Sequence, residues 1–337
     1  MAAITFKDRS IDVAEGQSVL EALLAAGEAH PHSCKTGACQ ACVARACSVA
    51  PPTSWQTGLS EPLKARGFFL TCQATSPPQG LEVATADDLP RFSLRVNSVS
   101  LPASNIAVLH FQSDQPLAYE PGQFIQLSRE DGLTRSYSLA SVPADGQLEL
   151  HVRRVPGGAM SEHLHAATQG HTFTARGPGG NCFYVAGRPE QTLILAGTGT
   201  GLAPLLGIAR HALAEGHTGP ITLIHGALSS EGLYASPRLQ TLAKQHENFK
   251  YVGCVKEAEE ASADLHVGDV SALVLQLTKA TPRARFFLCG PPDLVNGLRK
   301  QVFLAGANLR DILADAFVMA APAGGTAPAI VSVTDGG

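Results

Sequence analysis

Four residues in the middle of the chain, Arg135-Ser136-Tyr137-Ser138, set the interpretation of the whole sequence. They follow a strand-like run at Gln123-Phe124-Ile125-Gln126-Leu127 and a turn at Glu130-Asp131-Gly132. In an extended strand, Arg135 and Tyr137 point to the same side. Such a pair suits a phosphorylated cofactor with a flat ring, because a guanidinium binds pyrophosphate through two hydrogen bonds and a phenol ring packs on an isoalloxazine. An amphipathic strand with a surface arginine explains these residues equally well, so other motifs must decide.

The composition excludes several classes of protein. A length of 337 residues allows two or three domains, and 45% hydrophobic with 16% charged residues describes a soluble globular protein. A net charge of -4 and the lack of a basic run argue against a nucleic-acid partner. No apolar run is long enough to cross a membrane, and residues 1–10 lack a signal-peptide core. We therefore predict a cytoplasmic protein, in which eight cysteines indicate metal binding or catalysis rather than disulfides.

The first segment of the chain predicts a hairpin followed by a short helix. The hairpin strands are expected at residues 4–6 and 10–13, with a polar turn between them. Ser18 is placed to cap the helix, Glu21 completes a capping box, and Gly27 ends the helix.

Four cysteines after this helix have the spacing C-x4-C-x2-C followed, after 29 residues, by a fourth cysteine. This spacing is typical of plant-type [2Fe-2S] ferredoxins, in which a loop brings three thiolates to a cluster and a distant strand supplies the fourth. Gly37 and Ala38 keep the loop backbone close to the cluster. We predict that residues 1–90 form a β-grasp ferredoxin domain with the cluster ligands Cys34, Cys39, Cys42 and Cys72.

A zinc site with four cysteine ligands is the alternative, and it would make this segment an interaction module. Such sites usually pair two short C-x2-4-C knuckles, whereas this sequence has one. Cys47, Cys182 and Cys254 fit neither pattern and are expected to be small buried residues. Gln40 departs from the small residue that commonly follows the second cysteine of plant-type ferredoxins, so its side chain is expected to turn away from the sulfides.

The next segment, residues 91–186, predicts an antiparallel barrel after a polar linker at 84–90. Short strands alternate with turns such as Pro121-Gly122 and Asp145-Gly146. After the strand at 148–153, two glycines open the backbone, and we expect Ser161 to begin a short helix whose free N–H groups can meet a pyrophosphate.

The Arg-x-Tyr-Ser motif, followed about twenty residues later by Gly-Gly-x-Met-Ser, resembles the FAD site of the ferredoxin-NADP reductase superfamily. The resemblance implies that Arg135 binds the pyrophosphate, Tyr137 packs on the isoalloxazine and Ser138 bonds near its reactive nitrogen. The implied FAD-binding residues are Arg135, Ser136, Tyr137, Ser138, Gly157, Gly158, Ala159, Met160 and Ser161. The glycine-rich stretch 176–180 resembles the closing turn of that barrel, and a structural turn is its more economical role.

Residues 187–319 predict an α/β domain with a parallel sheet. The buried strand expected at 192–196 runs into a glycine-rich turn at 197–204, where bare backbone can approach phosphate before a helix at 205–214. The turn is not the full dinucleotide fingerprint, so alone it indicates only a β-to-α connection. Further strands at 221–226 and 284–290 alternate with a helix at 237–245.

Together with this turn, Cys289-Gly290-Pro291-Pro292 resembles the NAD(P)H-binding module of the same superfamily. The resemblance places Thr198 and Thr200 near the pyrophosphate and nicotinamide, Cys289 against the nicotinamide carbon, and Phe317 over the flavin. A buried structural cysteine and a core phenylalanine are the alternatives. The implied nicotinamide-site residues are Gly197, Thr198, Gly199, Thr200, Gly201, Pro204, Ser229, Cys289, Gly290, Pro291 and Phe317, and the implied catalytic residues are Tyr137, Ser138, Cys289 and Phe317.

The stretch 227–231 offers no positive charge for the 2'-phosphate of NADPH and adds a carboxylate, so the sequence favours NADH. Residues 320–337 are rich in Ala, Gly, Pro and Thr without periodicity and are predicted to be a disordered tail.

The order of cluster, flavin barrel and nicotinamide domain resembles reductase components of multicomponent oxygenases that hydroxylate aromatic rings. The implied function is electron transfer from NADH through FAD and the [2Fe-2S] cluster to a terminal oxygenase component or a separate ferredoxin. Nicotinamide gives two electrons as a hydride and an oxygenase takes them singly, which explains the combination. Alternatives with the same modules are the reductases of a deoxysugar dehydratase or a diiron monooxygenase. A zinc-stabilised interaction module is the alternative of a different class.

Overall fold

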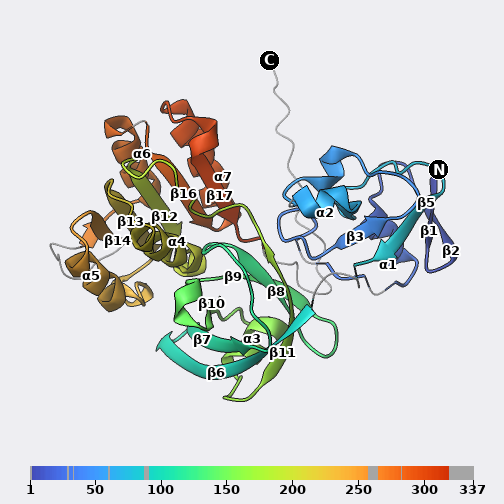
Figure 1. The fold of residues 1–337 in the computed structure, drawn as a ribbon, viewed down its shortest axis with the longest axis horizontal. Coiled ribbons are helices and arrows are strands. Elements are labelled where there is room, and N and C mark those ends of the chain that lie inside the picture. Colours follow the sequence, from blue (N-terminus) through green and yellow to red (C-terminus); the bar gives the residue numbers. More distant parts are fainter. Residues whose placement is uncertain are drawn as a thin grey trace.

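The computed structural model describes residues 2–28, 30–32, 34–59, 61–86, 91–256, 265–281 and 283–318. Its strands form three sheets, which are a β-grasp sheet, an antiparallel barrel and a parallel sheet, in the order that the sequence predicts. Figure 1 shows the barrel and the parallel sheet packed together, with the β-grasp sheet standing to one side.

The β-grasp sheet has the strand order β2-β1-β5-β3-β4. Its hairpin is antiparallel, and β1 pairs with β5 in parallel. The predicted capping box is confirmed, because the Glu21 amide donates to Ser18 Oγ and the Ser18 amide donates to the Glu21 carboxylate. The elements are β1 (Ala2–Phe6), β2 (Arg9–Val13), α1 (Val19–Ala25), β3 (Val43–Ala46), η1 (Thr53–Gln56), α2 (Glu61–Ala65), β4 (Phe68–Leu70) and β5 (Leu81–Thr85).

The barrel has the strand order β10-β7-β6-β11-β8-β9, and every pair in it is antiparallel. A bridge between Leu139 and Leu150 joins the last strand to the first, and the interior holds buried side chains such as Phe111 and Phe173. The predicted barrel is therefore confirmed. Its elements are β6 (Arg91–Ala103), β7 (Ile106–Ser113), β8 (Phe124–Ser128), β9 (Thr134–Ser138), η2 (Pro143–Asp145), β10 (Leu148–Arg153), α3 (Ala159–His165) and β11 (Thr172–Gly179).

The third sheet has the order β15-β14-β13-β12-β16-β17 and is parallel throughout. One face packs on α4 and the other on α6 and α7, so its central strands are buried on both sides. Its elements are β12 (Leu193–Thr198), η3 (Gly199–Gly201), α4 (Leu202–Ala214), β13 (Ile221–Ala227), η4 (Ser230–Gly232), α5 (Ser236–Gln245), β14 (Phe249–Val255), β15 (Leu265–Val267), α6 (Val270–Ala280), β16 (Arg285–Gly290), α7 (Pro292–Leu304), η5 (Leu309–Asp311) and β17 (Ile312–Ala316).

Three local expectations are wrong. Helix α4 begins at Leu202 and not at 205, so Pro204 lies inside its first turn, where a missing N–H costs no helical hydrogen bond. Helix α3 begins at Ala159, two residues before Ser161, because the backbone already turns at Gly157 and Gly158. Cys47 is exposed rather than buried, whereas Cys182 and Cys254 are buried as expected. The predicted tail at 320–337 lies outside the described residues.

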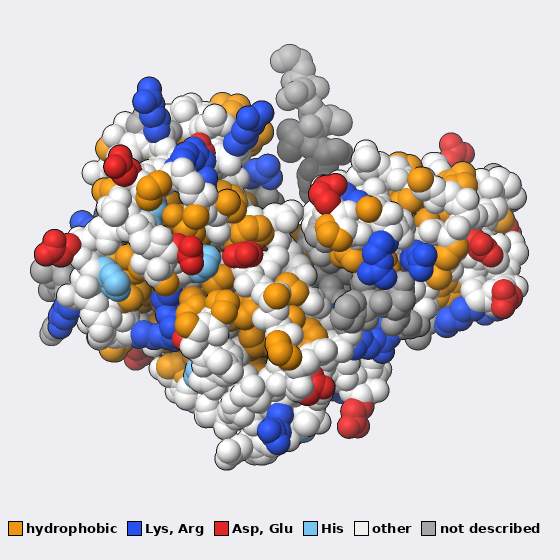
Figure 2. Space-filling model, viewed as in Figure 1, with side chains coloured by type: hydrophobic (Ala, Val, Ile, Leu, Met, Phe, Trp, Pro, Cys, Tyr) orange, Lys and Arg blue, Asp and Glu red, His pale blue; other side chains and the backbone are white. Residues whose placement is uncertain are grey.

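No helix in the described part of the chain has the length and apolarity that a membrane crossing requires. On the face drawn in Figure 2, acidic and basic side chains are interspersed over all three sheets.

Candidate functional site

The four predicted cluster cysteines lie together as two pairs. The amides of Cys34 and Cys39 each approach the sulfur of the other residue, at 3.4 and 3.3 Å. Cys42 and Cys72 form the second pair, in which each thiol shifts the pKa of the other, raising that of Cys42 and lowering that of Cys72. Two thiol pairs match the needs of a [2Fe-2S] cluster, in which four cysteines serve two irons.

Two features of the cluster-loop backbone suit a bound iron-sulfur cluster, a tight turn at a glycine and an amide that points at a cysteine sulfur. Gly37 has a φ of +86°, and a Cβ atom there would lie 3.0 Å from the Gln73 side chain. The Thr36 amide points at Cys34 Sγ over 3.4 Å, and the Cys39 thiol with the Thr36 amide lowers the pKa of Cys34, which favours the thiolate. Within the described residues no three His, Cys, Asp or Glu side chains surround a single metal position, whereas the paired thiols suit a binuclear cluster.

Gln40, the residue that departs from the ferredoxin pattern, bonds away from the cysteines. Its backbone has a φ of +55°, and its Nε2 donates to the Gly58 carbonyl over 2.7 Å. Its Oε1 lies against the barrel, because a Cβ atom on Gly179 would be 3.0 Å from it. The cluster loop therefore touches the glycine turn of the barrel at this side chain.

The β8–β9 ribbon presents its predicted flavin-site residues on two faces. Arg135 donates from Nη1 to the Thr134 carbonyl over 2.8 Å, and Tyr137 packs against the barrel core. Ser136 and Ser138 lie on the opposite face, where Ser136 Oγ donates to the carbonyl of Cys39 over 3.0 Å. A hydroxyl of the expected flavin strand thus bonds the cluster loop.

The glycine turn before α3 is sterically constrained. Gly157 has a φ of +70°, and a Cβ atom on Gly158 would be 2.7 Å from Ser161 Oγ. Ser161 Oγ accepts from the Val155 amide over 3.0 Å, so this hydroxyl stabilises the turn. The described contacts do not join α3 to Arg135. They join it to Arg129, a residue that the sequence analysis missed, through a 3.0 Å hydrogen bond to the Ala159 carbonyl.

The predicted nicotinamide residues converge at the ends of β12 and β16. Cβ atoms on Gly197 and Gly201 would lie 2.5 and 2.4 Å from the Cys289 carbonyl, so only glycine fits at both positions. The backbone of Gly290 lies beside Thr198, and the Phe317 amide donates to the Gly290 carbonyl over 2.7 Å. Pro204 is buried in α4, whereas Ser229 and Pro291 are exposed.

Asp315 links the flavin strand β9 to the residues at the ends of β12 and β16. The sequence did not predict this role. Ser138 Oγ donates to its carboxylate over 3.1 Å, and Asp315 pairs with Cys289 across β16 and β17. Burial raises the pKa of Asp315 to about 6. The signal was available, because Asp315 lies two residues before Phe317.

The Cys289 thiol is buried, and its sulfur lies 3.8 Å from that of Cys182. Burial raises the pKa of Cys289, so the thiol stays protonated and packs as a neutral group. The structure therefore places Cys289 at the predicted strand end without making it a nucleophile.

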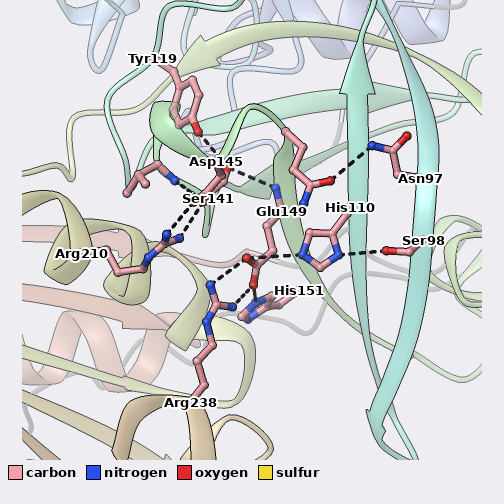
Figure 3. A network of polar contacts seen from close by, with 12 residues as sticks. Asn97, Ser98, His110, Tyr119, Ser141, Asp145, Glu149, His151, Arg210 and Arg238 are labelled. Atoms are coloured by element: carbon pink, nitrogen blue, oxygen red, sulfur yellow. Dashed lines mark hydrogen bonds and ion pairs between the residues drawn. The ribbon is translucent and has the colours of Figure 1, made fainter. Parts of the chain in front are cut away.

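Paired charges clamp the barrel to the nicotinamide sheet (Figure 3). Arg210 of α4 grips Asp145 through two hydrogen bonds of 2.7 and 2.6 Å. Arg238 of α5 grips Glu149 in the same way, and His151 donates to the same carboxylate. Although burial acts to raise the pKa of Glu149, the hydrogen bonds from its neighbours hold it below its ordinary value.

Aromatic rings connect these paired charges to the glycine-rich turn that follows β12. Tyr234 bonds His151 Nδ1 over 2.8 Å and stacks edge-to-face on His225 at 5.4 Å. Burial lowers the pKa of His225 to about 4, so the ring is neutral and its Nε2–H donates to the Gly199 carbonyl over 3.0 Å.

Three known domain families match successive parts of the chain. Residues 4–76 match the 2Fe-2S iron-sulfur cluster binding domain, 93–184 the oxidoreductase FAD-binding domain, and 195–300 the oxidoreductase NAD-binding domain. The chain thus carries domains for all three expected cofactors.

Curated relatives align over almost the whole chain. The reductase component of the naphthalene 1,2-dioxygenase system of Pseudomonas putida is 30% identical, with 92% of this chain and 96% of the relative covered. The reductase subunit of an aromatic O-demethylase of Amycolatopsis is 32% identical, with 87% and 91% covered. Among solved structures, the Amycolatopsis cytochrome P450 reductase GcoB superposes with a TM-score of 0.65 at 30% identity, covering 94% of this chain and 99% of GcoB.

Proposed function

The chain belongs to the family of reductase components that supply aromatic oxygenase systems, and from this membership we propose that it passes electrons from NADH through FAD and a [2Fe-2S] cluster to an oxygenase component or its separate ferredoxin. One observation carries the proposed order. A single face of the β8–β9 ribbon bonds the cluster loop through Ser136 and the nicotinamide sheet through Ser138. The strand that resembles a flavin site thus touches both electron donor and electron acceptor domains.

The chemistry that a bound flavin supplies is acceptance of a hydride and release of its electrons one at a time. The chain's residues bind and orient the reactants. Arg135 offers a guanidinium for the pyrophosphate and Tyr137 an aromatic face. Ser138 holds its hydroxyl against Asp315, a carboxyl that exchanges a proton near neutral pH. The backbone carbonyl of Cys289 lies against the glycine turn, and its buried thiol stays protonated beside Cys182.

A preference for NADH is part of the proposal. The 2'-phosphate of NADPH needs a cation after the second strand of the sheet, and β13 is followed by Leu228, whose exposed fraction is 75%. Glu231 adds a negative charge in η4. Both residues favour the cofactor that lacks the phosphate.

We assign residues 1–90, 91–186 and 187–319 to the three domains. The described strands support these limits, because β5 ends at Thr85, β11 ends at Gly179 and β12 begins at Leu193. A cytoplasmic location belongs to the same proposal, since the cluster cysteines must stay reduced until iron binds.

The function is tested by mixing the FAD- and cluster-loaded protein with NADH without oxygen and following flavin and cluster absorbance. We expect the flavin to bleach first and the cluster second. The Cys72→Ser variant should keep NADH-dependent ferricyanide reduction and lose cytochrome c reduction, because the flavin remains and the one-electron exit is gone. Cys47→Ser is the matched control, since Cys47 is exposed and outside the thiol pairs.

Equal loss of both activities in Cys72→Ser would contradict the proposed order. A colourless native protein that contains zinc and lacks iron and sulfide would instead favour the interaction module.

A further inference from the structure

Two side chains of the barrel bind one backbone atom of the cluster loop. The carbonyl oxygen of Cys39 accepts from Gln126 Nε2 over 3.1 Å and from Ser136 Oγ over 3.0 Å. Gln126 and Ser136 are directly opposed in the β8–β9 pairing, so their side chains lie on one face and converge on one acceptor. This acceptor belongs to a residue whose sulfur is a cluster ligand in the proposed function.

Gln40 fixes the orientation of this carbonyl. A φ of +55° is rare for glutamine, and it turns the chain immediately after Cys39. The side chain is buried, bonded to the Gly58 carbonyl and seated against Gly179 of the barrel. A smaller residue at position 40 would turn the chain equally well but would lack the contact with the barrel.

The two junctions of the barrel differ in kind. Paired arginines and carboxylates clamp the nicotinamide sheet, as Figure 3 shows. Between the β-grasp domain and the barrel, Gln126 and Ser136 both donate to the carbonyl of Cys39, and Gln40 contacts Gly179. The β-grasp domain lies to one side of the barrel in Figure 1. The hydrogen bonds to Cys39 and the Gln40 contact lie where the cluster loop meets the flavin strand, so they bear directly on the distance between the two.

We propose that Gln126 is a positioning residue for electron transfer within the molecule, acting with Ser136 and Gln40 to hold the cluster loop at a fixed distance from the flavin strand. The proposal rests on the proposed function, and it concerns only the step from flavin to cluster. Electron transfer slows steeply as donor and acceptor separate, so a loosened loop delays cluster reduction without changing hydride transfer from NADH.

The first test measures the contact itself by deuterium exchange of the loaded, oxidised protein. Removing one hydrogen bond weakens such a contact about fivefold, so in Gln126→Ala the amides of residues 35–41 should exchange about fivefold faster. Gln126→Glu keeps the length of the side chain but turns an oxygen toward the carbonyl, so it should have at least the same effect. A role in packing alone would leave Gln126→Glu close to the native protein.

The second test follows flavin and cluster absorbance after anaerobic mixing with NADH. We expect slower cluster reduction in Gln126→Ala, an unchanged rate of flavin reduction and an unchanged EPR spectrum of the reduced cluster. Gln40→Gly should also slow cluster reduction, because glycine adopts the same φ but leaves Gly179 without its contact. Ser128→Ala is the matched control, since Ser128 lies on the same face and bonds Thr134.

The proposal is overturned if Gln126→Ala, Gln126→Glu and Gln40→Gly all match Ser128→Ala in both exchange and cluster reduction. Failure of the proposed function looks different, because NADH would then leave the flavin of the native protein oxidised while the exchange measurement would still report on the contact.

Discussion

Replacing Asp315 by Asn should stabilise the protein at alkaline pH and remove a pH dependence from its reaction. The carboxyl accepts from Ser138 over 3.1 Å, and burial raises its pKa from 3.8 to about 6. This difference corresponds to about 3 kcal/mol of penalty on the charged form in the folded state. The folded protein keeps the proton at pH values where the unfolded chain has lost it. Stability therefore falls as the pH rises from about 4 to about 6 and is then constant.

Asparagine avoids this penalty and still offers an oxygen to Ser138. We expect Asp315→Asn to gain about 1 to 3 kcal/mol in free energy of unfolding at about pH 8 and almost nothing at about pH 4, measured by urea denaturation of the FAD-loaded protein. The rate of flavin reduction by NADH should lose the part of its pH dependence near pH 6 that Asp315 contributes, because burial places the pKa of this carboxyl at about 6.

Asp311→Asn provides a control of opposite sign. The Asp311 carboxylate is paired with Arg188, so its removal should destabilise the protein at neutral pH. An Asp315→Asn variant that is less stable than the native protein at about pH 8, by the same amount as at about pH 4, would refute the burial argument.

Three further changes test the junctions and the cofactor preference. Arg238→Ala should lower the free energy of unfolding by about 1 to 3 kcal/mol, less than for a fully buried pair because 44% of the arginine side chain is exposed. The loss in free energy of unfolding, measured by urea denaturation, should become smaller as the pH falls. Glu149 has a depressed pKa in the folded protein, so the stability that it contributes with its partners is lost on acidification. Gly122→Ala should prevent stable folding, because the added Cβ atom would lie 2.4 Å from a backbone carbonyl and the residue has a φ of +102°. Gly132→Ala is the control, since open space surrounds this residue, and it should cost about 1 kcal/mol of stability in thermal melts. Leu228→Arg should raise kcat/KM for NADPH relative to NADH, and an unchanged ratio would contradict the assignment of this loop to the 2'-phosphate position.

The order and type of the three sheets were predictable because each module has a strong local signal. Three of the four cluster cysteines, the Arg-x-Tyr-Ser strand and the glycine turn before α4 each occupy a short run of the sequence. The capping box of Ser18 and Glu21 was predictable for the same reason, since its partners are three residues apart. Helix starts were less predictable, as α4 shows, because a first turn accepts proline at several positions.

The contacts between modules were not predictable, because they join residues far apart in the chain. Gln126 and Cys39 are separated by 87 residues, and Ser138 and Asp315 by 177. A glutamine on a strand and an aspartate near a phenylalanine have many ordinary roles, and only the tertiary fold assigns these. The exposure of Cys47 was missed because cysteine is usually buried, and its place just after β3 overrides that tendency.

The barrel binds the cluster domain through a backbone carbonyl, and this has an evolutionary consequence. Every amino acid carries that atom, so most of the N-terminal domain can diverge in sequence while the barrel continues to recognise it, provided that Gln40 keeps its contact with Gly179. Chimeras that replace residues 1–90 by the corresponding domain of a distant relative should therefore assemble when the barrel keeps its glutamine and serine donors and the graft keeps a glutamine at position 40, which makes this domain a natural unit for exchanging one electron exit for another.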